Sequence, residues 1–135
     1  MARRTFTRDE AESVLREIRP LAARMVGAWR SLETTREAQE RLEVRIRGNG
    51  GGIPPQELAA AQDEVERAAN AVAGYVEAIQ ERGVVVNDIE SGLLDFPSIR
   101  DGREILLCWQ LGEPAIAYWH DPEEGFAGRR PLQEG

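Results

Sequence analysis

The sequence predicts an α+β fold: a long antiparallel helical hairpin followed by a C-terminal three-stranded antiparallel meander. Two apolar seams of helical spacing flank a glycine-rich segment, and residues 91–120 contain two turn signals between apolar runs. We expect a single domain over residues 1–135. Its expected parts are helices at 7–47 and 55–82, a glycine-rich tip at 48–54, a small β-sheet at 84–120 and an irregular tail at 121–135.

The first helix is predicted from a start signal and a long apolar seam. Thr7 and Glu10 have the spacing of a capping box, in which each side chain bonds the backbone N–H of the other residue. Apolar residues then recur at alternating spacings of three and four, as in a coiled coil. They are Ala11, Val14, Ile18, Leu21, Met25, Ala28, Leu32, Leu42 and Ile46, with Thr35 and Gln39 inside the seam. Pro20 removes one helical hydrogen bond, so we expect a kink or a break there.

The second helix begins at Pro54 or Pro55 and is expected to stop before Gly83. Its seam is Leu58, Ala61, Val65, Ala68, Val72, Tyr75 and Ile79. A short loop between two seams predicts an antiparallel pair. Pairing outward from the loop places Arg82 opposite Pro20, so residues 8–19 extend past the second helix and can cover a sheet. The remaining stalk has a narrow seam, and we expect a homodimer through this helical surface.

Turn chemistry sets the strand pairing of the meander. Asp101-Gly102 predicts a two-residue hairpin turn, and the loop 112–114 separates the second strand from the third. Because side chains alternate between the faces of a strand, this register assigns four apolar residues to the core face: Ile105, Leu107, Trp109 and Trp119. The outer face then carries Asp95 beside Cys108, with Tyr118 adjacent and His120 diagonal. A slip of one residue would separate this group.

Composition narrows the classes of function. The chain has 135 residues, a net charge of −7, and 17 Arg but no Lys. An acidic balance disfavours general nucleic-acid binding, although the first helix is rich in arginine. No apolar run is long enough for a membrane span or for the core of a signal peptide. A single cysteine cannot form an internal disulfide, which suits a reducing compartment. We therefore expect a cytoplasmic protein.

Three chemical interpretations of the outer face stay open. Asp95, Cys108 and His120 are suitable ligand types for a transition metal, which is the only cofactor candidate. The same residues could act as orienting carboxylate, nucleophile and base. Tyr118, Arg129 and Arg130 could instead form an anion clamp. The plain alternative is a buried apolar cysteine and a histidine that caps a strand.

Ordered motifs along nearly the whole chain resemble a known family. They are Phe6-Thr7, Glu10-Ala11, the glycines at 48–52, Gly92–Pro97, Arg103–Trp109, Tyr118-Trp119-His120, Gly128-Arg129 and Pro131-Leu132. In this order they are similar to the bacterial family catalogued as domain of unknown function 2203. The resemblance implies a small bacterial cytoplasmic protein and assigns no activity.

Two functional hypotheses follow from the sequence. The first is a non-enzymatic interaction or scaffold protein that self-associates through its helices. The second is a small metal-binding protein or enzyme that uses Asp95, Cys108, Tyr118 and His120. Enzymatic activity is not favoured, because no ligand-pair or nucleophile motif surrounds these residues. Convergence of the four side chains would favour the second hypothesis.

Overall fold

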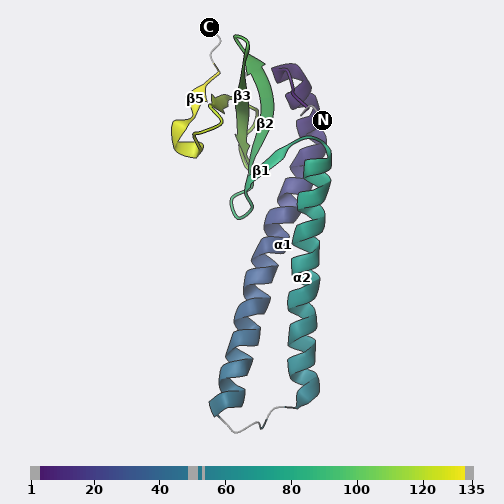
Figure 1. Cartoon of the computed structure of the whole chain (residues 1–135). Coiled ribbons are helices and arrows are strands. Elements are labelled where there is room, and N and C mark those ends of the chain that lie inside the picture. The colour runs from purple at the N-terminus through teal and green to yellow at the C-terminus, as the bar shows by residue number, and fades with distance from the viewer. Residues whose placement is uncertain (1–3, 49–51, 53, 133–135) are drawn as a thin grey trace.

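A computed structural model of the chain describes residues 4–48, 52 and 54–132, and shows a helical stalk with a sheet at one end (Figure 1). Helices α1 (Arg8–Gly48) and α2 (Pro55–Glu81) form the predicted antiparallel hairpin. The sheet follows as β1 (Val85–Asp88), β2 (Leu93–Arg100), β3 (Arg103–Gln110), β4 (Tyr118–His120) and β5 (Arg130–Pro131), with a 3-10 turn at Phe126–Gly128. The strands lie in chain order, and each pair is antiparallel. The predicted tip at 48–54 falls mostly outside the described residues.

The capping box forms as expected, but Pro20 does not split α1. The Thr7 N–H donates to Glu10 Oε1 at 2.8 Å, and the Glu10 N–H donates to Thr7 Oγ1 at 3.1 Å. The helix is continuous through Pro20, which lies on an exposed face. Solvent there can replace the hydrogen bond that the proline removes, so the helix can tolerate it.

The alignment of the two helices agrees with the predicted pairing of Arg82 opposite Pro20. The Arg82 guanidinium contacts Glu17 Oε1 at 3.1 Å, about one turn before Pro20. The first turns of α1 therefore extend beyond α2 and pack on the sheet. Ala11, Leu15 and Ile18 are buried in the same core as Phe96 and Trp109. This contact attaches the stalk to the sheet.

The register of the central strands is the predicted one. Asp101 has φ 52° and Gly102 has φ 79°, the left-handed pair that a tight type I′ turn requires. Asp95 consequently pairs with Cys108, and Cys108 pairs with Tyr118 across the next strand boundary. The core face carries Ile105, Leu107, Trp109 and Trp119 as expected.

The sheet differs from the predicted meander at its edges. β1 and β5 add one strand on each side, so the tail at 121–135 is not wholly irregular. The expected strand over 115–120 shortens to Tyr118–His120. Side chains of α1 compete for its backbone: the Ile116 N–H donates to Glu12 Oε2 at 2.8 Å, and Arg8 donates to the Ile116 carbonyl at 3.1 Å. These bonds replace the strand ladder.

The face of the sheet opposite the helices is also covered. Figure 1 shows the chain after β4 folding back beside the sheet before it forms β5. Leu132 donates its N–H to the Ala117 carbonyl at 2.8 Å, which fixes this segment to the edge of the sheet. Asp95, Cys108 and His120 are therefore buried, although the sequence placed them on an outer face. No described helix is long and apolar enough to cross a membrane.

Candidate metal centre

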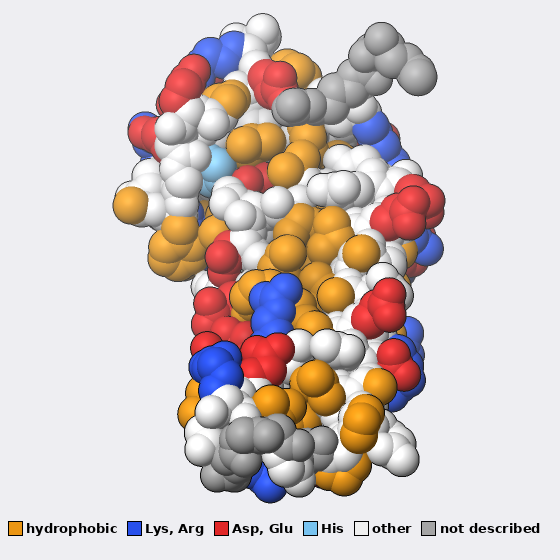
Figure 2. Space-filling model, turned by 60° about the horizontal axis from the view of Figure 1, so that its bottom comes forward, with side chains coloured by type: hydrophobic (Ala, Val, Ile, Leu, Met, Phe, Trp, Pro, Cys, Tyr) orange, Lys and Arg blue, Asp and Glu red, His pale blue; other side chains and the backbone are white. Residues whose placement is uncertain are grey.

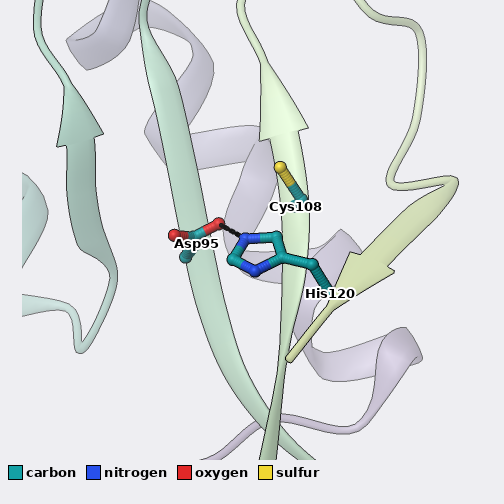
Figure 3. A group of neighbouring side chains, drawn as sticks. All are labelled: Asp95, Cys108 and His120. Carbon is teal, nitrogen blue, oxygen red and sulfur yellow. Dashed lines mark hydrogen bonds and ion pairs between the residues drawn. The ribbon is translucent and has the colours of Figure 1, made fainter. Parts of the chain in front are cut away.

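Three potential metal ligands converge on the second face of the sheet. Asp95 extends from β2, Cys108 from β3 and His120 from β4. The Asp95 carboxyl and the His120 ring point toward each other, and the Cys108 side chain lies beside them (Figure 3). One ligand atom from each lies within 4.8 Å of the other two. Asp95, Cys108 and His120 are exposed by 2%, 0% and 1%. Strand pairing brings the group together, because Asp95 pairs with Cys108 and His120 lies diagonal to Cys108, opposite Leu106.

Hydrogen bonds fix the orientation of the His120 ring. Its Nδ1 lies 2.8 Å from the Asp121 carbonyl oxygen, and its Nε2 lies 3.0 Å from Asp95 Oδ1. A carbonyl only accepts, so Nδ1 carries a hydrogen. One further proton must lie between Nε2 and the Asp95 carboxyl for that contact to be a hydrogen bond. The ring is thus held with Nε2 toward the other two ligand types.

Asn87 completes the surroundings of Asp95. Its side-chain amide donates to Asp95 Oδ2 at 2.8 Å. Asn87 itself is exposed and stands at the point where the β1–β2 register shifts between Val86 and Asp88. Sequence reasoning missed this residue, because the polar segment that contains it gives no sign of a bulge.

The Cys108 thiol is held in its protonated form. Burial, aided by the negative charge of Asp95, raises the pKa of Cys108 to about 12, and Arg129 partly opposes this shift. Reactive cysteines have a lowered pKa and partial exposure instead. Both ring nitrogens of His120 also already face oxygen atoms. This arrangement suits metal coordination better than nucleophilic catalysis.

A partly buried charge pair lies against the strand that carries Cys108. Arg129 donates to Glu113 Oε1 at 2.7 Å, and its guanidinium also lies 3.4 Å from the Cys108 carbonyl oxygen. Burial alone would raise the pKa of Glu113, but Arg129 and the Gln110 N–H hold it below its ordinary value. Glu113 was predicted only as a loop residue, and no local pattern links it to Arg129. Arg129 and Glu113 carry opposite charges, so together they add no net charge beside the centre.

The residues of the predicted anion clamp do not converge on one point. Arg129 stacks 4.0 Å above the Tyr118 ring, whereas Arg130 stacks 4.8 Å from the Trp119 ring. Tyr118 and Trp119 face opposite sides of the sheet, so the two arginines diverge. Arg130 also contacts Glu124 Oε1 at 3.2 Å. Both cations already have carboxylate partners, and the anion clamp stays a prediction.

Comparison with known proteins identifies the family of the chain. The profile of an uncharacterized conserved protein family, domain of unknown function 2203, matches residues 4–132. The chain belongs to this family. No curated protein and no solved structure matched it. The family description assigns no activity, so functional inference depends on the centre itself.

Proposed function

We propose that this member of the 2203 family binds one transition-metal ion through Asp95 Oδ1, Cys108 Sγ and His120 Nε2. The observation that carries the proposal is the burial of all three ligand types within 4.8 Å of one another. A sulfur, nitrogen and oxygen set suits Zn²⁺ and related ions. Ligand atoms around a tetrahedral zinc ion lie about 3–4 Å apart, so modest side-chain rotations would suffice.

The hydrogen bond on the far side of the His120 ring supports this assignment. Metal-bound histidines commonly donate their other ring N–H to a carbonyl or carboxylate. His120 already makes that contact through Nδ1 to Asp121, which leaves Nε2 as the ligand atom. A bound ion would take the place of the proton between Nε2 and Asp95. It would also provide the charge that a thiolate at Cys108 needs in this buried position.

The proposed ion has a structural role rather than a catalytic one. Its ligands come from three neighbouring strands, so coordination would clip β2, β3 and β4 together. Exposure of 2% or less leaves no room for a substrate beside the ion while the tail is in place. The proposal therefore describes a non-enzymatic protein whose sheet is stabilised by metal. A reducing cytoplasm would keep Cys108 available as a thiol.

Elemental analysis of protein purified without a tag or a chelator tests the proposal. We expect a near-stoichiometric transition metal in the wild type and its loss in Cys108→Ala, which removes the softest ligand with a small change in volume. Asp121→Asn is the matched control, since it changes an adjacent carboxylate outside the ligand set. A metal-free wild type that also fails to bind added Zn²⁺ or Co²⁺ would refute the proposal.

A second candidate function, self-association through the stalk, has its own supporting observations. Leu58 and Val65 remain half-exposed in the seam of α2, and Val44 on α1 is 52% exposed. Figure 2, viewed with the tip forward, shows hydrophobic side chains among charged ones along the stalk. Residues 20–48 of α1 carry six arginines and four glutamates, whereas α2 carries six acidic residues and one arginine. Two copies could pair α1 with α2 and cover these surfaces as a coiled-coil homodimer.

Sedimentation equilibrium tests this second function. We expect dimerisation that depends on concentration and is weakened in Val44→Glu. Val85→Glu is the control, because Val85 is exposed by 37% on β1, away from the stalk. A monomeric mass at high protein concentration would count against self-association.

A further inference from the structure

One side of the stalk packs on neither the sheet nor the neighbouring helix. On α1 its residues recur at spacings of three and four, so they form one row along the helix. Leu15, Ala22 and Val26, which pack in the core with the sheet, occupy another side of α1. The outer row of α1 is Gly27, Ser31, Thr34, Ala38, Arg41 and Arg45, and all six are exposed.

A matching outer row runs along α2. It consists of Ala60, Glu64, Arg67, Ala71, Gly74 and Ala78, which are exposed or half-buried. Most side chains of the two rows are those of Gly, Ala, Ser or Thr, so the helix backbones lie close to the surface. Another helix can pack on such a surface at a short interaxial distance. The two rows together form the outer face of the stalk.

Each row contains one glycine that the single chain does not require. Gly27 and Gly74 lie inside the helices without a positive φ, and a Cβ at either would meet no heavy atom within 4 Å beyond the adjacent residues and its own turn of helix. Glycine is unfavourable in a helix interior, and it is useful where another backbone must approach closely. Arg45 lies 4.0 Å from Glu57, which fixes the relative heights of the helices. Counting back 18 residues on α1 and forward 17 on α2 places the two glycines at the same height.

Charge decides which helices can meet across this face. The outer row of α1 contributes Arg41 and Arg45, whereas Glu57 and Glu64 lie near the same heights on α2. A two-fold axis parallel to the stalk places α1 of one copy on α2 of the other, and so brings opposite charges together. Arg41 and Glu64 are then offset by three residues, about 4.5 Å along the axis, which their long side chains can span. A two-fold axis across the stalk would instead place the arginine rows against each other.

We propose that the outer face of the stalk is the docking surface of a second copy of this chain, with α1 of each copy against α2 of the other and both sheets at the same end. The inference rests on the self-association proposed above, and it adds the face and the direction. Because the outer face lies away from the sheet, the sheets do not come between the two stalks. Gly27 of one copy lies beside Gly74 of the other, and the four helices form a bundle. Val44 borders this face, in a hollow that Arg41 and Arg45 also line.

Gly27→Leu tests the close approach of the two copies. We expect the dissociation constant of the dimer, measured by sedimentation equilibrium, to rise at least about tenfold, because a leucine is forced into a close contact. The fold should be retained, since this position has space within the single chain, and circular dichroism would verify it. Ala73→Leu is the matched control, because Ala73 is exposed beside Gly74 but lies about 100° around α2 from it. Its dissociation constant should stay within about twofold of the wild-type value.

A charge exchange tests the direction of the two copies. Arg41→Glu and Glu64→Arg should each raise the dissociation constant about fivefold to tenfold at low ionic strength, because like charges then face each other. An equimolar mixture of the two variants should form a heterodimer of nearly wild-type affinity, since both exchanged pairs are then opposite in charge. A wild type that dimerises without rescue in the mixture, or without an effect of Gly27→Leu, would overturn this docking surface and leave self-association through another face. A wild type that stays monomeric at high concentration would refute self-association itself.

Discussion

Removal of His120 in metal-free protein should cost far more stability than its single side chain suggests. His120→Ala removes the ring that bonds the Asp95 carboxyl, which is 2% exposed in the wild type, and leaves it the Asn87 amide and the Cys108 thiol. Loss of one hydrogen-bond partner from a buried polar group costs about 1–3 kcal/mol, and more where the group is charged, because the group stays desolvated. We expect a loss in this range in the free energy of unfolding.

Urea unfolding at pH 7 with a chelator present would measure this effect. The chelator excludes any contribution from a bound metal, and a double-mutant cycle with Asp95→Ala isolates the pair. The double variant should be no less stable than the worse single variant, with a coupling energy of about 2–3 kcal/mol. Glu17→Ala, which breaks an exposed pair with Arg82, should cost about 0–1 kcal/mol.

A loss below about 1 kcal/mol in both single variants would refute the reasoning. It would mean that the pair is hydrated in solution, or that the tail does not hold this face of the sheet closed. If the two single-variant losses simply add in the double variant, Asp95 and His120 do not interact energetically. Either result would also weaken the case for a preformed metal centre.

Three further predictions concern the Cys108 thiol and the cap of α1. In metal-free folded protein at pH 7, Cys108 should resist iodoacetamide and react at once in denaturant, as mass spectrometry would record, because its thiol is buried with a pKa of about 12. Its folded pKa lies above the ordinary 9.0, so the stability it contributes is complete below about pH 9 and is lost toward pH 12. With a chelator present, the melting temperature should therefore fall more steeply between pH 8 and 10.5 for the wild type than for Cys108→Ala. Equal slopes would contradict this prediction. Thr7→Ala should lower the unfolding free energy by about 1 kcal/mol, measured in urea, because α1 loses its cap; no change would show that the box is not formed.

The pairing within the centre could be predicted from sequence because short turns fix register. A two-residue loop at Asp101-Gly102 allows one pairing of its flanking strands, and Asp95 must then face Cys108. Because side chains alternate between the two faces of a strand, the next pairing places Tyr118 beside Cys108 and His120 on the same face. Local chemistry was therefore sufficient for the convergence of the ligands.

Features that depend on distant segments could not be predicted in this way. The cover over the centre comes from the contact of Arg129 with Glu113, and the shortened β4 results from Glu12 binding the Ile116 N–H. Periodicity carries no information on such pairs, which form only when the tail and the first turns of α1 meet the sheet. Pro20 shows the same limit, because its effect depends on which side of α1 faces solvent.

The attachment of the first turns of α1 to the end of the sheet has a consequence for synthesis on the ribosome. Glu12 and Arg8 bond to Ile116 across separations of 104 and 108 residues. Synthesis proceeds at about 5–20 residues per second, so the strands that cover the apolar side of these turns are made roughly 5–20 s after the turns themselves. The two helices can pair with each other well before that time, since their contacts close a shorter loop. The nascent chain thus exposes Leu15 and Ile18 during this interval, and this is where a chaperone would be expected to bind.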